Sequence, residues 1–187
     1  MLKKGKKRNH KRKNHNTNIN LTTISLQCAG LSSKLQSFDR VLSEVAPSIV
    51  FMQETKVTKP IRTEHTSGYD IFQLPRINSN GGGVALCAVK HLQPVLLREG
   101  DNETEAISVS ITTNQMKIRC VCGYTQEKYS DEQKEKFWDF MSREVLEAED
   151  AEQGIIIQMD ANAHAETSVL KNDTLPQNLK ERDCLSF

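Results

Sequence analysis

Two short apolar runs, each ending in an acidic residue, constrain the fold of this chain more than any other feature. The first extends from Ser48 to Glu54 and the second from Ile155 to Asp160. Apolar runs of this length predict buried strands. Residues two apart on a strand share a face, so Asp160 and Asn162 would point the same way if the strand geometry continues through them. An acid at a strand end is often a simple turn residue. Two such acids can also supply the oxygen ligands that a hard divalent cation prefers.

The first sixty residues predict a strand, a helix and a second strand. Residues 19–28 are rich in β-branched side chains, which favour a strand. Residues 35–45 repeat apolar side chains at helical spacing, Pro47 ends that helix, and Ser32 or Ser33 is the expected N-cap. The first apolar run then follows. This order of elements is typical of the α/β class.

The middle of the chain predicts several strands joined by short links. The expected strands are 69–74, 84–89, 95–98, 106–111 and 116–124. Links this short favour hairpins, so a mixed or antiparallel sheet is expected. The glycines at 81–83 have two interpretations: a loop that cradles a phosphate, or a hairpin that leads into a tightly packed strand. No Gly-Lys-Ser/Thr sequence follows them, which favours the hairpin.

The longest predicted helix begins at Ser130, where Ser130 and Gln133 have the spacing of a capping box. Its apolar stripe is expected to consist of Phe137, Phe140, Met141 and Val145. Trp138 flanks that stripe, and we expect it to pack and not to stack on a base. Nine acids and three bases between residues 131 and 152 are assigned to the outer face of the helix, which predicts a surface that repels phosphates.

The charge of the chain is divided unevenly. Residues 1–16 contain eight Lys and Arg and no acid, whereas the rest of the chain has 17 basic and 24 acidic residues. Residues 1–18 are therefore predicted to be a disordered basic tail, either a nucleic-acid or nuclear-localisation patch or a solubilising segment. Its basic residues are Lys3, Lys4, Lys6, Lys7, Arg8, Lys11, Arg12 and Lys13.

Other kinds of protein are disfavoured by the composition. At 187 residues with 37% hydrophobic and 26% charged residues, the chain suits one water-soluble domain. We see neither an apolar run of about 20 residues that could span a membrane nor a secretory signal. Five cysteines without a Cys-x-x-Cys motif argue against disulfides and a zinc site. A nuclear or cytoplasmic protein that is not secreted and has no membrane partner is expected.

Five short motifs occur in an order that resembles the endonuclease/exonuclease/phosphatase superfamily, which has the DNase I-like fold. The resemblance is closest to the apurinic-type endonuclease domains encoded by non-LTR retrotransposons. The motifs are Leu26-Gln27-Cys28-Ala29-Gly30-Leu31, Gln53-Glu54-Thr55-Lys56, Gly82-Gly83-Val84-Ala85, Gly123-Tyr124 with Tyr129-Ser130-Asp131, and Asp160-Ala161-Asn162-Ala163-His164. The resemblance implies an α/β (α+β) domain over residues 19–187. Its fold would be a four-layer sandwich of two mixed β-sheets flanked by helices.

The resemblance also implies a Mg²⁺-dependent hydrolysis of phosphodiesters, with Mn²⁺ as the alternative ion. Glu54 would hold the metal, helped by Gln27, which stands where the family usually has Asn. Asp160 would orient or deprotonate the attacking water, Asn162 would bind the scissile phosphate, and Tyr124 would support the phosphate oxygens. The implied partners are DNA and a reverse transcriptase encoded by the same element.

The family pattern continues with a further Asp and a terminal Asp-His pair, which this sequence lacks. The five histidines include none after His164, and His164 belongs to the Asp-x-Asn-x-His motif itself. We therefore expect a member truncated at its C-terminus, with its last strands missing and with weak or no activity. A phosphatase of the same superfamily and a non-catalytic DNA-binding remnant are the alternatives to a DNA endonuclease.

Overall fold

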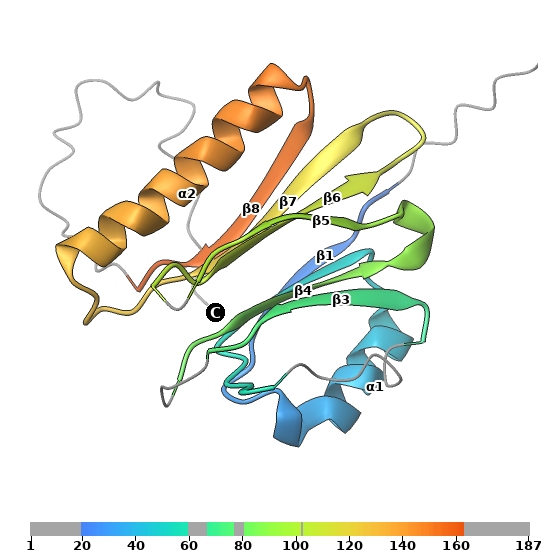
Figure 1. Ribbon diagram of the computed structural model, residues 1–187. Helices are drawn as coiled ribbons and strands as arrows, with labels where there is room; N and C mark the ends of the chain where they lie inside the picture. The colour runs from blue at the N-terminus through green and yellow to red at the C-terminus, as the bar shows by residue number, and fades with distance from the viewer. Residues whose placement is uncertain (1–19, 60–66, 77–80, 102, 163–187) are drawn as a thin grey trace, which may run out of the picture.

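The computed structural model describes residues 20–59, 67–76, 81–101 and 103–162, and these residues form a four-layer sandwich. Two mixed β-sheets of four strands each pack face to face, with helix α1 (Leu35–Val45) outside one sheet and helix α2 (Asp131–Asp150) outside the other (Figure 1). The fold class expected from the sequence is thus confirmed.

The first sheet has the strand order β1-β2-β4-β3. Its strands are β1 (Thr23–Gln27), β2 (Ile49–Gln53), β3 (Tyr69–Leu74) and β4 (Val84–Val89). β1 and β2 are parallel and are joined through a short 3₁₀ turn, η1 (Ser32–Lys34), and α1. The two other pairs in the sheet are antiparallel. All five residues of β2 are buried, as its uninterrupted apolar sequence predicts.

The second sheet has the order β5-β6-β7-β8 and follows a second 3₁₀ turn, η3 (Lys90–Leu92). Its strands are β5 (Val95–Glu99), β6 (Ala106–Thr112), β7 (Lys117–Tyr124) and β8 (Gly154–Asp160). The predicted hairpins appear as the antiparallel pairs β5/β6 and β6/β7, whereas β7 and β8 are parallel and joined by α2. Each sheet therefore contains one β-α-β unit.

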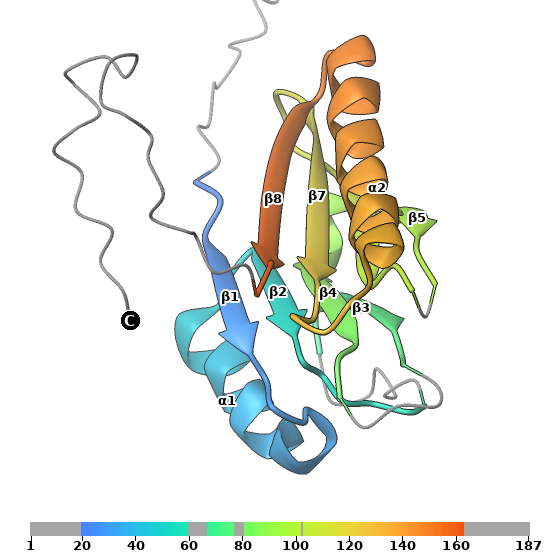
Figure 2. The ribbon, with the colours of Figure 1, turned by 90° about the vertical axis from the view of Figure 1, so that its left-hand side faces the viewer.

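The main core lies between the sheets, where apolar side chains of β2 and β4 meet those of β6 and β7. It includes Phe51, Leu86, Val109 and Cys120, all at most 1% exposed. The two parallel pairs run in the same direction across this core. Figure 2 shows the arrowheads of β1, β2, β7 and β8 at the same end of the molecule. That end therefore collects the residues that follow four different strands.

The start of α1 differs from the prediction. The N-cap is Lys34, without a side-chain hydrogen bond, and neither Ser32 nor Ser33 caps the helix. Both serines lie in η1, and the Ser33 hydroxyl donates to the Gly30 carbonyl at 3.3 Å. The 3₁₀ turn delays the helix, because its backbone follows a tighter hydrogen-bonding pattern before α1 begins.

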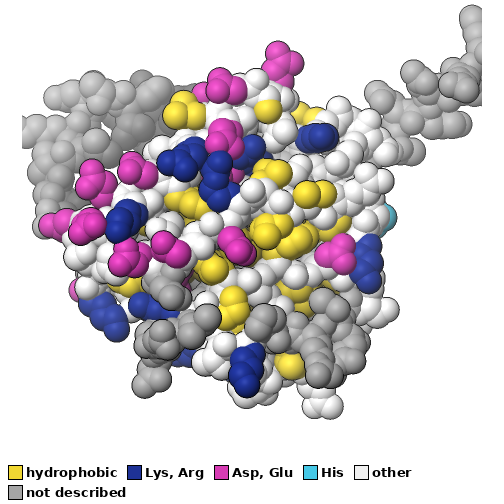
Figure 3. Space-filling view, viewed as in Figure 1, with side chains coloured by type: hydrophobic (Ala, Val, Ile, Leu, Met, Phe, Trp, Pro, Cys, Tyr) yellow, Lys and Arg dark blue, Asp and Glu magenta, His cyan; other side chains and the backbone are white. Residues whose placement is uncertain are grey.

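The capping box of α2 is confirmed: the Ser130 side chain accepts from the Gln133 N–H, and the Gln133 side chain accepts from the Ser130 N–H. The buried stripe is wider than predicted. Val145 is only partly buried, and Glu144, assigned above to the outer face, is 0% exposed. Acidic side chains, with Lys and Arg among them, gather on the left of the molecule in Figure 3, where α2 runs in Figure 1. Apolar side chains lie across the middle of that view, where β5 runs.

Several expectations fall on residues outside the described ranges. These are the basic tail, His164 and the residues that follow it. Within the described residues, no helix has the length and apolar character needed to cross a membrane.

Candidate active site

Four residues meet at the end of the molecule where β1, β2, β7 and β8 all terminate. Glu54 follows β2, Tyr124 ends β7, Asp160 ends β8 and Gln27 ends β1. Tyr124 and Asp160 are register partners in the parallel pair β7/β8, so their side chains lie side by side. Glu54 and Asp160 belong to different sheets, and hydrogen bonds through Tyr124 and Gln27 connect the two sheets here.

Glu54 has a left-handed backbone, with φ 49°, immediately after the extended strand β2. This turn directs its carboxylate toward the second sheet, where the Tyr124 hydroxyl donates to Oε1 at 3.0 Å. The Lys56 ammonium lies 3.5 Å from Oε2. The Glu54 side chain is 24% exposed, so one part of the carboxylate is held by the protein while another part faces solvent.

Tyr124 is 6% exposed, and its pKa is raised to about 12. Burial is the largest cause, followed by the hydrogen bond to Glu54 and the negative charge of that carboxylate. The Asn162 side chain, within hydrogen-bonding reach of the phenol, acts in the opposite direction. The phenol is thus protonated well beyond neutral pH, and its hydrogen bond to Glu54 makes Tyr124 a fixed donor.

Asp160 and Asn162 come together in a way that the sequence did not predict. The strand ends at Asp160, and Asn162 has a left-handed backbone with φ 41°, so the strand geometry does not continue to Asn162 and strand alternation does not apply there. Asp160 Oδ1 accepts the backbone N–H of Asn162 at 3.1 Å, as in turns closed by an Asp side chain. The Asn162 amide donates to the Thr125 carbonyl at 2.7 Å. Gln27 Nε2 donates to Asp160 Oδ2 at 3.0 Å and thus contacts Asp160, not Glu54.

Two hollows adjoin this cluster. One of about 480 Å³ is lined by Tyr124, Gln126, Glu127, Lys128 and Asn162. The other, of about 330 Å³, extends from Asn162 to Lys134 and Trp138 on α2. Trp138 contacts the edge of Phe137, with ring centroids 5.5 Å apart, yet 46% of it is exposed. The cluster therefore opens onto a surface with room for a ligand larger than an ion.

The donor set of this cluster fits Mg²⁺. Glu54 and Asp160 supply carboxylate oxygens, Gln27 and Asn162 carry amide oxygens, and the site is open to solvent. Mg²⁺ binds one or two carboxylates and keeps several waters, whereas zinc takes a closed set of His and Cys ligands. The described part of the chain has no group of three or more His, Cys, Asp or Glu residues that could hold a metal ion, so the cluster supplies two carboxylates and not a closed set of ligands.

Glu105 was given no role in the sequence analysis, yet it lies just behind the cluster and is 1% exposed. Its carboxylate accepts the N–H of Gly83, so this amide does not face a phosphate. Gly81, Gly82 and Gly83 all have positive φ and lead into β4, which agrees with the hairpin interpretation. The sequence signal for this buried carboxylate was an acid directly before the apolar run of β6, but an acid in that position resembles an ordinary strand-end residue.

No protein-family model matches this chain, and no curated protein matches it in sequence. Solved structures do. The endonuclease domain of TRAS1, a telomere-specific non-LTR retrotransposon, is 17% identical with a TM-score of 0.50, over 78% of this chain and 61% of that chain. The human Nocturnin catalytic domain is 12% identical with a TM-score of 0.57, over 77% and 64%. The 3′ phosphatase NExo from Neisseria, bound to a product DNA hairpin, is 17% identical with a TM-score of 0.52, over 76% and 57%. This chain thus spans about three fifths of their length.

Proposed function

We propose that this chain, which has the DNase I-like endonuclease/exonuclease/phosphatase fold, carries the metal-binding and water-positioning part of a phosphodiesterase site that acts on DNA. One observation carries this proposal. Glu54, Tyr124, Asp160 and Asn162 converge on one solvent-open cluster although they come from two separate sheets.

Glu54 is the residue that would hold a divalent cation, and Asp160, oriented by Gln27, ends a strand of the other sheet at the same edge. When bound, Mg²⁺ or Mn²⁺ polarises the phosphoryl group and offsets the negative charge that develops during hydrolysis. The Tyr124 hydrogen bond holds the Glu54 carboxylate in place. The left-handed turn at Glu54 leaves its other oxygen directed toward solvent and Lys56.

The other side chains suit the remaining tasks of hydrolysis. Asp160 is an anionic acceptor that can orient a water molecule and take its proton, and Gln27 fixes the direction of that carboxylate. The Asn162 amide is a neutral donor that can hydrogen-bond phosphate oxygens, and Tyr124 supports the site by using its single O–H to hold Glu54. Donors held before the reaction stabilise developing negative charge without reorganising.

DNA is the substrate class that the surroundings of the site favour. Lys128 and Lys134 line the hollows beside Asn162 and can neutralise flanking phosphates. The eight cationic residues of the N-terminal tail add sequence-independent attraction. Two of the similar structures are, by name, an endonuclease and a 3′ phosphatase bound to a DNA product. The retroelement lineage and a reverse transcriptase partner rest on the sequence motifs. A phosphatase acting on a small phosphomonoester is the second candidate.

Mn²⁺ binding to residues 1–187, measured by calorimetry, tests the metal site. We expect saturable binding by the wild type and binding at least about 10-fold weaker in Glu54→Ala, which removes the main ligand. The matched control is Glu44→Ala, because Glu44 is an exposed acid on α1 paired only with Arg40 among its described contacts. Equal affinities for Glu54→Ala and the wild type would contradict the proposed site.

Nicking of supercoiled plasmid tests the chemistry. We expect nicking that requires Mg²⁺ or Mn²⁺ and that falls by about 10²–10³ in rate in both Glu54→Ala and Asp160→Asn, because each variant removes one charged group of the cluster. Cation-dependent release of phosphate from a phosphomonoester, without nicking, would favour the second candidate.

A further inference from the structure

A buried carboxylate outside the cluster connects the segments on which the cluster is built. Glu105 immediately precedes β6 and is 1% exposed. A charge this deeply buried is tolerated only where donors surround it. Its donors come from segments that are distant in the sequence, so its contacts join parts of the chain that local structure leaves separate.

Three groups meet the Glu105 carboxylate. The Gly83 N–H and the Tyr129 hydroxyl both donate to it. The Arg76 guanidinium pairs with Oε1 at 2.7 Å and also lies over the Tyr129 ring, 5.6 Å from its centroid. The end of β3, the glycine segment (Gly81–Gly83) and the loop between β7 and α2 are therefore fixed to one point.

The glycine segment in turn holds the turn that contains Glu54. The Thr55 N–H donates to the Gly83 carbonyl at 3.1 Å, and the Lys56 N–H donates to the Gly82 carbonyl at 2.9 Å. Both Glu54 and Lys56 have positive φ, 49° and 50°. A left-handed backbone costs a non-glycine residue about 1–2 kcal/mol, so this turn depends on the contacts that surround it.

Two positions of the glycine segment, Gly82 and Gly83, have no room for a side chain. A Cβ on Gly82 would overlap both carboxylate oxygens of Glu105 and lie 2.9 Å from the Arg76 guanidinium. A Cβ on Gly83 would lie 2.7 Å from Thr55 Oγ1. The close approach of the glycine segment to Glu105 on one side and to the Glu54 turn on the other thus requires glycine at both positions.

Glu105 also acts on the other side of the cluster. Its backbone carbonyl accepts the Tyr124 N–H at 2.9 Å, while its carboxylate accepts the Tyr129 hydroxyl from the loop that follows. Tyr124 is the donor that holds Glu54. Glu105 is therefore connected to Glu54 by two chains of hydrogen bonds, one through the glycine segment and one through Tyr124.

We infer that Glu105 is a positioning residue for the metal site: it fixes the backbone of the Glu54 turn and the loop after Tyr124 without touching the ion or the substrate. This inference rests on the proposed function only for the identity of the ion. Partners that orient metal ligands typically contribute about 10–100-fold to metal affinity.

The test compares Glu105→Gln with Glu144→Gln in the full 187-residue chain. Glu144 is equally buried and is ion-paired with two arginines, Arg98 and Arg119, but it lies on α2, away from the cluster. We expect Glu105→Gln to speed amide hydrogen exchange at Thr55 and Lys56 by about 10-fold and to weaken Mn²⁺ binding by about 10-fold. Glu144→Gln should lower the melting temperature and leave both quantities unchanged.

The two readouts separate this inference from the proposed function. Unchanged exchange at Thr55 and Lys56 in Glu105→Gln would overturn the positioning role, whatever the metal does. A wild type that binds no Mn²⁺ would overturn the proposed function, while exchange at these two amides would still decide the role of Glu105. If Glu105→Gln does not fold, Tyr129→Phe replaces it. This variant removes one hydrogen bond to the carboxylate and should shift both quantities in the same direction by a smaller factor.

Discussion

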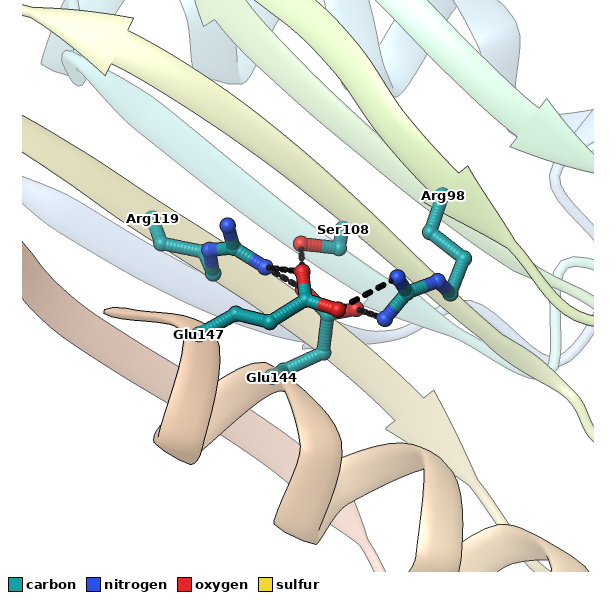
Figure 4. A network of polar contacts seen from close by, with 5 residues as sticks. All are labelled: Arg98, Ser108, Arg119, Glu144 and Glu147. Atoms are coloured by element: carbon teal, nitrogen blue, oxygen red, sulfur yellow. Dashed lines mark hydrogen bonds and ion pairs between the residues drawn. The ribbon is translucent and has the colours of Figure 1, made fainter. Parts of the chain in front are cut away.

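The buried carboxylate of Glu144 provides a strong test of how α2 is attached to the second sheet. Figure 4 shows Glu144 and Glu147 on α2 facing Arg98, Ser108 and Arg119, which come from three different strands. Glu144 is 0% exposed and accepts from Ser108, from Arg98 and, at 2.6 Å, from Arg119. Glu147 pairs with the same two arginines at 2.7 and 2.9 Å but is 41% exposed.

We expect Glu144→Gln to lower the free energy of unfolding by about 3–5 kcal/mol, the usual loss when one partner of a buried ion pair is removed. Glutamine keeps the volume of the side chain but replaces one acceptor oxygen with a donor NH₂ among groups that all donate. Arg119, with its side chain 8% exposed, then retains only Glu147 among its described ion-pair partners. At about 2–4 °C per kcal/mol for a domain of this size, the melting temperature should fall by about 10 °C.

Urea unfolding followed by circular dichroism measures this change, and Glu147→Gln is the control on the same helix. Since Glu147 is solvent-exposed, its replacement should cost clearly less free energy of unfolding than that of Glu144. The pKa of Glu147 is held below its usual value, first by the Arg98 hydrogen bond and then by that of Arg119. Its own contribution is therefore present above the unfolded pKa and is lost as the pH falls through the lowered value. Equal losses in the two variants would refute the argument that burial sets the cost.

Three further predictions concern the glycine segment, the thiols and the tail. Gly83→Ala should lower the free energy of unfolding more than Gly68→Ala does, and the difference measured by urea unfolding should be about 1–3 kcal/mol. Both glycines have positive φ, but only the Cβ at Gly83 meets a neighbour, and equal losses would show that the contact is unimportant. Burial raises the pKa of four thiols above 9.0, so the folded state keeps protons that the unfolded state loses. The free energy of unfolding should therefore fall above pH 9, by about 1.4 kcal/mol per pH unit for each thiol. Alkylation of these thiols in the folded protein should be slow, and fast labelling would contradict their burial. The four thiols are Cys28, Cys87, Cys120 and Cys122. Deleting residues 1–16 removes eight cations and should flatten the salt dependence of DNA binding in a titration, whereas an unchanged slope would make the tail a solubiliser.

Local patterns in the sequence were sufficient for most of the secondary structure. The uninterrupted apolar run before Glu54 became a fully buried strand, and the Ser130 capping box formed as its spacing indicated. These features depend on neighbours within a few residues, so the sequence contains their physical cause. The motifs around Glu54, Tyr124 and Asp160 likewise identified the strand ends that converge.

The sequence patterns misled where a distant partner or a local turn overrides the periodicity of a helix or a strand. Helical spacing placed Glu144 among the outer acids, because no pattern within α2 reveals arginines on separate strands. Strand alternation does not extend to Asn162, because the strand ends at Asp160 and the Asp160 side chain accepts the Asn162 backbone N–H.

The sequence by itself determined the elements, their order and the residues at their ends. Only the tertiary structure decided which of the acids are buried and what each one holds. Glu105 is bound by Gly83 and Tyr129, at separations of 22 and 24 residues. Burying a carboxylate is unfavourable until all of its donors are in place, and those donors come together only when the two sheets pack.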